Sequence, residues 1–326
     1  MTASQSCDIL PRAGKVSRRS VVVGGLIPAL GLGLPRLLSA ELATRSANSP
    51  KSCIFIYQYG GLSQLDSWDP KPFAASEVRG PYQPISTAVP GFQVGELMPR
   101  LASLADRYAV IRSMSHSVPV HDVANKMLLA GQSLPAADAP SFGAVVSKLR
   151  PSTSSVPSHV WLQKFGGGAA PPESAYLTGG FLGMAHSPLL IGTNHEEHLA
   201  NPQFRVKAFD TADGVSLDRL RARRDLLKSV DTSKDNLADS GQQKFQERAF
   251  DLLSGSHSRN AFDIEGEAPT VRDRYGRHPL GQNLLLARRL IEAGVRLVNV
   301  VAWTGLAAHE KFMSIETWDM HGNAGI

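Results

Sequence analysis

Polar side chains gather in the short loop that follows the first expected strand of this chain. The group comprises Gly60, Gly61, Ser63, Gln64, Asp66, Ser67 and Asp69. Glycine pairs allow positive φ and a close approach to the backbone, while hydroxyl, amide and carboxylate groups suit a polar ligand. Open α/β sheets bind ligands at the carboxyl ends of their strands. We therefore expect a ligand-binding loop; the alternative is an ordinary turn with two solvated aspartates.

Imidazole groups occur at two further places where a loop meets an expected strand or helix. His116 and His121 lie in a polar loop before a helix, and Asp319 and His321 follow the last expected strand. Histidine can ligate metal or move protons near neutral pH. His121, Asp319 and His321 are the favoured site residues; His116 is a candidate substrate contact, with a surface position as the default alternative.

The first strand must deliver the loop, and its composition predicts how it is buried. Residues 54–57 are β-branched or aromatic and unbroken by charge, which is typical of a strand buried on both faces of a parallel sheet. Cys53 begins this strand, where we expect a small core residue rather than a reactive thiol.

Hydrophobic periodicity predicts further helices and strands that alternate along the chain. Helices are expected over 96–106, 122–131, 141–149, 216–230, 242–253 and 280–293, and strands over 108–114, 159–162, 189–192 and 295–302. Asp122 is the expected cap of its helix, and Gly131 and Gly294 are expected helix ends. Residues 70–91, rich in proline and glycine, are expected to be irregular. The alternation predicts an α/β fold.

Composition and charge narrow the class of protein. The chain has 326 residues, of which 42% are hydrophobic and 19% charged, so it can bury a sizeable core. Its formal charge is +5, but residues 1–45 alone carry +4 and leave only +1 for the body. The basic character therefore belongs to the leader, and charge gives no case for a nucleic-acid partner.

The first 45 residues resemble an export signal. Arg18 and Arg19 precede an apolar, glycine-rich segment over 21–34, and small residues follow around Ala40. This order matches a twin-arginine signal peptide, which predicts a periplasmic or extracellular protein handled by the twin-arginine export machinery. The alternative is a membrane anchor, but the apolar run is shorter than the roughly 20 residues of a spanning helix, so no stable membrane span is expected.

Several blocks, taken in order, resemble one known family. They are CIFIYQYGGLSQLDSWDPKP, RGPYQPISTAVPGFQVGELMPRLASLADRYAVIRSMSH, RDRYGRHPLGQNLLLARRLIEAGVRLVNV and WDMHGN, together with the twin-arginine leader. The chain is similar to the bacterial domain of unknown function 1501 family, which is grouped with the alkaline phosphatase and sulfatase superfamily. The resemblance implies a three-layer α/β/α sandwich, alkaline phosphatase-like, over residues 46–326, whose sheet edge holds divalent metal and a phosphate or sulfate ester.

The resemblance also implies roles for individual residues. His121 matches the start of the helix that carries the nucleophile in that superfamily, and Asp319 and His321 match an aspartate and histidine metal pair. Tyr59 stands where a metal aspartate is expected, and Asp66 is the nearest carboxylate that can substitute. The implied cofactor is zinc, calcium or magnesium, and Gly60, Gly61, Ser63, Gln64 and His116 are candidate substrate contacts.

These features favour an exported, metal-dependent hydrolase of small-molecule or glycan phosphate or sulfate esters. A second hypothesis is a binding or scaffold protein on the same fold. Tyr59 and His121 favour it, because the active enzymes of the superfamily have other residues at both positions. A third is a nonfunctional C-terminally truncated product, since the sequence stops soon after His321 and the superfamily's other metal ligands lie beyond that point.

Overall fold

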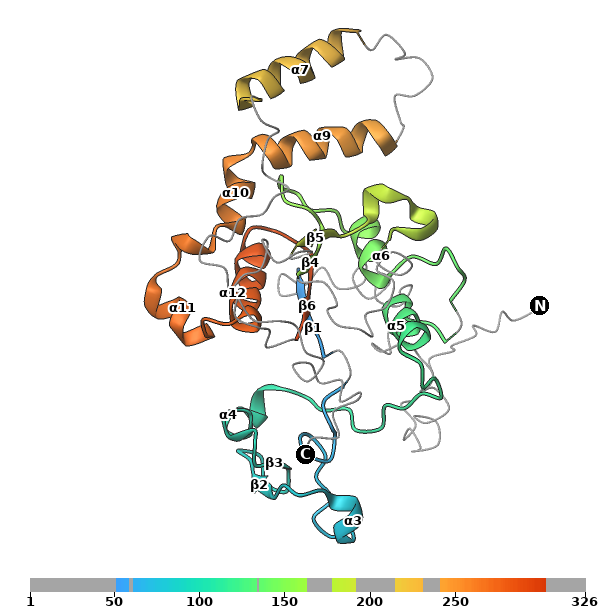
Figure 1. The fold of residues 1–326 in the computed structure, drawn as a ribbon, viewed down its shortest axis with the longest axis vertical. Helices are drawn as coiled ribbons and strands as arrows, with labels where there is room; N and C mark the ends of the chain where they lie inside the picture. The colour runs from blue at the N-terminus through green and yellow to red at the C-terminus, as the bar shows by residue number, and fades with distance from the viewer. Residues whose placement is uncertain are drawn as a thin grey trace, which may run out of the picture.

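The fold is of the α/β type and is built around a parallel sheet (Figure 1). The computed structural model describes residues 51–58, 61–133, 135–162, 178–191, 215–230 and 241–302. Residues 1–45, predicted to form a signal peptide, lie outside these ranges, so that assignment stays a prediction.

Four parallel strands form the main sheet, in the order β1-β6-β4-β5. Their bounds are Cys53–Tyr57 for β1, Leu297–Val301 for β6, His159–Leu162 for β4 and Leu189–Ile191 for β5. The register pairs Tyr57 with Val301 and Leu162 with both Val300 and Ile191. All four strands therefore finish at one edge, which is the carboxyl edge of the sheet.

One face of the sheet carries the apolar core. Strand residues such as Val160, Val298 and Val300 pack there against Leu286 and Leu290 of α12 (Pro279–Glu292). Further residues of this core come from α10 (Ser256–Phe262) and from the 3-10 turn η6 (Ile264–Gly266). We call this side the α12 face.

The opposite face contacts α5 (His121–Ala130) and α6 (Phe142–Leu149), and Figure 1 shows the two sets of helices on either side of the sheet. The ring of Phe55 lies edge-on to Phe142, with centroids 5.2 Å apart. Gly143 lies so close to the His159 ring that a Cβ there would come within 2.1 Å of Cε1. This α5/α6 face thus holds aromatic and polar strand residues.

Local sequence signals explain where these helices begin and end. Ser141 caps α6 by accepting a hydrogen bond from the Ala144 amide at 3.2 Å. Pro279, which lacks an amide hydrogen, occupies the first turn of α12. Gly131 ends α5 in the left-handed conformation with φ 69°, which glycine adopts without a Cβ penalty.

A small lobe follows β1 and lies below the sheet in Figure 1. It contains the antiparallel pair β2 (Pro84–Ser86) and β3 (Gln93–Gly95), and the short helices α3 (Ser76–Arg79) and α4 (Pro99–Ala102). Tyr108 packs edge-on against both Trp68 and Phe92. The lobe is therefore held by a small aromatic cluster rather than by the main core.

Two longer helices, α7 (Leu217–Val230) and α9 (Gly241–Ser254), extend from the other end of the molecule (Figure 1). Arg224 joins them through its Nη1, 3.7 Å from Asp251 Oδ1. Helix α11 (Pro269–Tyr275) flanks α12. Among the described residues no helix has the length and apolar character needed to cross a membrane.

Most predicted elements of the sheet-bearing body are confirmed. The strands expected over 159–162, 189–192 and 295–302 are β4, β5 and β6. The helices expected over 122–131, 141–149, 216–230, 242–253 and 280–293 are α5, α6, α7, α9 and α12. Asp122 was wrongly expected to cap α5, because the cap position is Val120 and no side chain caps that helix.

The predictions for the first strand's surroundings were less accurate. No strand forms over 108–114; Ile111 and Met114 are exposed there, and Arg112 is bonded to the Gln93 carbonyl of the small lobe. The helix expected over 96–106 is reduced to α4 and a 3-10 turn (Ala105–Arg107), because Pro99 fixes its start. Residues 70–91, expected to be irregular, include α3 and β2.

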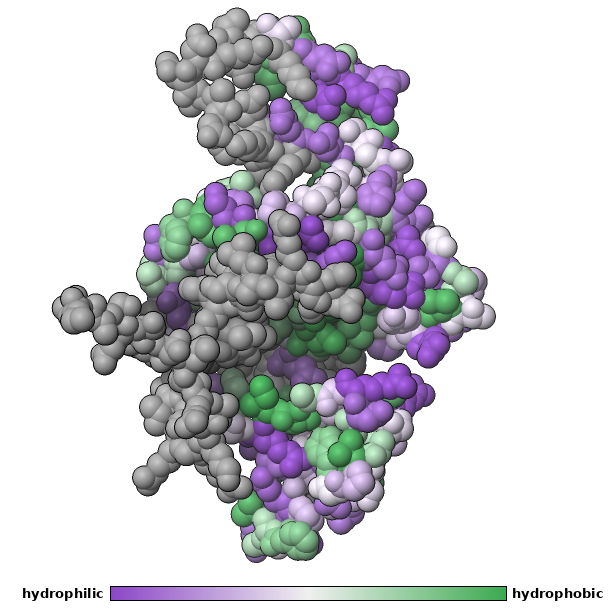
Figure 2. Space-filling model, turned by 180° about the vertical axis from the view of Figure 1, so that it is seen from behind, coloured by the Kyte–Doolittle hydropathy of each residue, from purple (hydrophilic) through white to green (hydrophobic). Residues whose placement is uncertain are grey.

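Strand β1 forms as predicted, but its expected burial on both faces is wrong. Ile54 is 37% exposed and Ile56 51% exposed, and among the described residues the apolar core includes none from β1. Cys53 is also exposed rather than a core residue. Figure 2 shows a recessed apolar area between the sheet-bearing body and the small lobe.

Candidate functional site

The carboxyl edge of the sheet is the place where the sequence predicts chemistry. Tyr57, Leu162, Ile191 and Val301 are the last residues of its four strands. Parallel strands bring the loops that follow them to one rim, where α/β proteins bind ligands. Gly60, Asp319 and His321 belong to segments after β1 and β6 and lie outside the described residues, so their predicted roles stay predictions.

Helix α5 is joined to this edge by a hydrogen bond between a half-buried and a buried side chain. The Tyr57 hydroxyl, at the end of β1, donates to Oδ1 of Asn125. Asn125 is only 3% exposed, and its Nδ2 has no hydrogen-bond partner among the residues that the structure describes. A buried amide donor without an acceptor costs free energy, so Asn125 is suited to donate to an oxygen of a bound ligand.

His121 is the first residue of α5 and lies one helical turn before Asn125. Residues four apart share one side of a helix, so the position of His121 lies on the same side of α5 as Asn125; its side chain lies outside the described part of the structure. Because no side chain caps α5, its first amide groups are not satisfied by a cap. Amides at a helix start, together with the helix dipole, favour a negatively charged ligand.

The loop after β1 is held mainly by its own backbone. Ser67 Oγ donates to the Ser63 carbonyl at 2.6 Å, and the Asp69 amide donates to the Gln64 carbonyl at 2.8 Å. Gly61 has a positive φ of 75°. Gly61, Ser63 and Gln64 are all exposed, so they are accessible to a ligand but not preorganised around one.

The two aspartates of this loop differ in their surroundings. Asp69 is 7% exposed and bridges Lys71 at 2.5 Å and Arg112 at 3.5 Å, which commits its carboxylate to the small lobe. Asp66 has a buried Oδ1 with no hydrogen-bond partner in the described part of the chain. Its backbone packs against β3, where a Cβ on Gly95 would come within 2.1 Å of the Asp66 carbonyl oxygen.

A metal can use the free oxygen of Asp66, but the described residues do not complete a metal site. Within them, no group of three or more histidine, cysteine, aspartate or glutamate side chains is placed to hold an ion. Metal sites in hydrolases use about three protein ligands. His116 does not add one, because it is exposed and its Nδ1 accepts a hydrogen bond from the nearby Val118 amide at 3.3 Å.

Three residues of the α5/α6 face were not singled out from the sequence. Asn125 and Tyr57 form the bond described above, and His159 bonds through Nε2 to Asn299 Oδ1 at 3.1 Å. Burial lowers the pKa of His159 to about 4, against a weaker opposing effect of the Asn299 hydrogen bond. The sequence held one signal for these residues: a polar side chain stands where the periodicity requires an apolar one. A polar side chain at such a position is typically buried and bonded to a specific partner.

Comparison with known protein families gives a match over most of the chain. A family described as "Protein of unknown function (DUF1501)" matches residues 50–325. Neither the search of curated proteins nor that of solved structures found a match to the chain.

Proposed function

Because the chain belongs to the DUF1501 family of proteins of unknown function, we propose its activity from its own geometry: hydrolysis of phosphate or sulfate esters at the carboxyl edge of the sheet. The observation that carries this proposal is the buried Asn125 amide, whose Nδ2 lacks an acceptor one turn after the uncapped start of α5. The oxygens of a phosphate or sulfate group are acceptors that suit both the amide and the helix start.

The proposal includes the finer fold assignment. Helices α12 and α10 lie on one face of the sheet and α5 and α6 on the other, which supports a three-layer α/β/α sandwich of the alkaline phosphatase and sulfatase type. It also includes export by the twin-arginine route to the periplasm or beyond, which is supported by Arg18 and Arg19 in the sequence.

His121 is the proposed reacting group. As a nucleophile, a ring nitrogen that carries a lone pair bonds to phosphorus or sulfur while the ester bond to the alcohol oxygen breaks. The departing oxygen takes a proton from solvent water and leaves as the alcohol. Water then releases phosphate or sulfate and frees the imidazole. Asn125 is proposed to hold an ester oxygen in place through its Nδ2.

A divalent cation, which is zinc, calcium or magnesium in our proposal, supplies polarisation of the ester when bound. Asp66, Asp319 and His321 are its proposed ligands. Among the described residues, this metal site is supported only by the unpartnered Oδ1 of Asp66. The reaction steps given for His121 therefore use groups of the chain itself and not the metal.

The test uses the full chain with 4-nitrophenyl phosphate and 4-nitrophenyl sulfate, with and without added Zn²⁺, Mg²⁺ or Ca²⁺. We expect turnover that falls by at least about a hundredfold in His121→Ala and that persists in His257→Ala, an exposed histidine on α10 with no proposed role at the site. Loss of activity in both variants, or in neither, contradicts the assignment to His121.

A second candidate function is binding of such esters without turnover. The ion pairs of Asp69 with Lys71 and Arg112 favour it, because they remove one of the loop's two carboxylates from catalysis. Saturable binding of 4-nitrophenyl sulfate, with no 4-nitrophenol released under any metal condition, supports this alternative over hydrolysis.

A further inference from the structure

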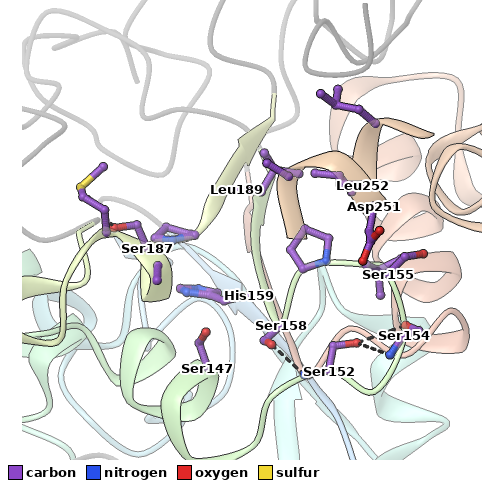
Figure 3. A pocket seen from close by; sticks show the side chains of 17 residues that line it. Ser147, Ser152, Ser154, Ser155, Ser158, His159, Ser187, Leu189, Asp251 and Leu252 are labelled. Carbon is purple, nitrogen blue, oxygen red and sulfur yellow. Dashed lines mark hydrogen bonds between the residues drawn. The ribbon is translucent and has the colours of Figure 1, made fainter. Parts of the chain in front are cut away.

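A cavity lies at the amino ends of β4 and β5, at the edge of the sheet opposite the proposed ester site. Its volume is about 390 Å³, which is within the range of small-molecule sites. The wall is formed by the loop that leads into β4, by the segment before β5 and by helix α9. Figure 3 shows its side chains around the start of the strands.

The lining combines apolar side chains with hydroxyl groups. Val156, Leu189 and Leu252 supply apolar surface. The hydroxyl groups come from Ser147, Ser152, Ser154, Ser155, Ser158 and Ser187. Several of these hydroxyls already bond to one another or to backbone: Ser155 Oγ and Ser258 Oγ are 2.7 Å apart, and Ser158 Oγ accepts from the Ser152 amide at 2.7 Å. Such a wall suits an apolar molecule with few polar groups.

His159 is the most deeply buried polar side chain of this wall, with 2% of its surface exposed. Figure 3 shows its ring on the same side of the strand as Ser147 and Ser187, whereas Asp251 and Ser155 lie on the other side. Its Nε2 contacts Asn299 Oδ1 at 3.1 Å. Because an amide oxygen only accepts hydrogen bonds, the ring proton belongs on Nε2, and Nδ1 carries a lone pair.

No residue in the described part of the chain uses that lone pair. Nδ1 of His159 has no hydrogen-bond partner among the described residues, although the side chain is almost fully buried. A buried acceptor left unpaired is costly, and His159 is one of the residues that line the cavity. The observation therefore indicates a ligand that offers a hydrogen-bond donor.

We propose that this cavity binds a small neutral molecule with an apolar body and a hydroxyl group, which donates a hydrogen bond to Nδ1 of His159. A carboxylate or phosphate is disfavoured, because the ring is held neutral by burial and offers no positive charge. The charged group of the wall, Asp251, repels anions as well, and it is paired with Arg224 at 3.7 Å.

The test compares 4-propylphenol with 4-propylanisole, its methyl ether, on the full chain by calorimetry. The two probes have similar apolar bodies, and only the phenol can donate. We expect the phenol to bind about tenfold more tightly, as one net hydrogen bond to a buried acceptor allows. The ¹⁵N resonance of His159 Nδ1 moves on addition of the phenol and stays in place with the ether.

Two variants separate the cavity from the hydrogen bond. In His159→Phe, the two probes bind with equal affinity; in Ala185→Trp, which fills the cavity from its wall, both lose binding. Lys148→Ala, at an exposed position outside the wall, keeps the tenfold preference. Equal affinities in the unaltered chain, or a preference that survives His159→Phe, overturn the proposal, as does absence of phenol binding.

Discussion

The two faces of the main sheet are buried in different ways. On the α12 face, the strand side chains are aliphatic and pack against Leu286 and Leu290 of α12. On the α5/α6 face, strands β1, β4 and β6 present Tyr57, His159 and Asn299, each with a specific polar partner. The difference teaches that one face stabilises the fold, whereas the other positions groups that can act on a ligand.

The largest effect is expected on the α12 face. Leu290→Ala leaves a cavity in the core, because Leu290 is fully buried there, and lowers the free energy of unfolding by about 2–5 kcal/mol. Urea denaturation measures it. Leu226→Ala, at a position 62% exposed on α7, is the matched control and changes stability by less than about 0.5 kcal/mol. Equal losses in the two variants contradict the assignment of the core to this face.

The α5/α6 face is expected to respond to pH instead. The pKa of His159 is about 4 in the folded chain and near 6.5 in the unfolded chain, so between these values the unfolded chain binds more protons. Stability from this residue is complete above pH 6.5 and is lost as the pH falls toward 4, by about 2–3 kcal/mol at pH 4.5.

Urea denaturation at pH 7 and pH 4.5 measures this loss. In His159→Phe the part of the pH dependence that comes from the imidazole is absent, so the difference between the two pH values becomes smaller by that amount. An unchanged difference shows that His159 is not the group that titrates.

A smaller effect tests how closely α6 approaches the sheet. In Gly143→Ala, the new methyl group meets the His159 ring, which must move, and we expect a loss of about 1–3 kcal/mol. Lys148→Ala, at an exposed position on the same helix, serves as the control. Thermal or urea unfolding distinguishes them, and a stabilising Gly143→Ala contradicts the close contact.

The smallest effect concerns the bond that joins β1 to α5. Tyr57→Phe removes the hydroxyl that donates to Asn125, and we expect a loss of about 0.5–1.5 kcal/mol in unfolding free energy. Ester binding falls in the same variant if α5 positions the site. If Tyr57→Phe loses stability but binds the ester as tightly as the unaltered chain, the contact between β1 and α5 stabilises the fold without positioning the site.

The sequence predicted the sheet-bearing body well, because its helices and strands have uniform apolar periodicity. Strand β4 and helices α6 and α12 follow from residues such as Leu162, Leu286 and Leu290 that are buried as the pattern requires. The small lobe was harder. Ile111 and Met114 have the composition of a strand, but Arg112 and Asp69 tie their segment to the lobe by polar contacts that periodicity does not reveal.

The candidate site was predictable only in its location. The carboxyl edge and the start of α5 at His121 follow from strand order and helix ends. The bond from Tyr57 to Asn125 and that from His159 to Asn299 join residues 68 and 140 positions apart, so no local pattern could pair them. Asp66 and Asp69 look alike in sequence. Only the fold shows that Asp69 is paired, whereas Oδ1 of Asp66 has no hydrogen-bond partner among the described residues.

The most direct measurement is a titration of the full ¹⁵N-labelled chain with inorganic sulfate, followed by the side-chain amide signals of Asn125 and the ring signals of His159. The account predicts that the Asn125 Nδ2 signals shift and saturate while those of His159 stay in place, because the anion binds at the carboxyl edge. A shift of the His159 signals alone, or of neither residue, would contradict it.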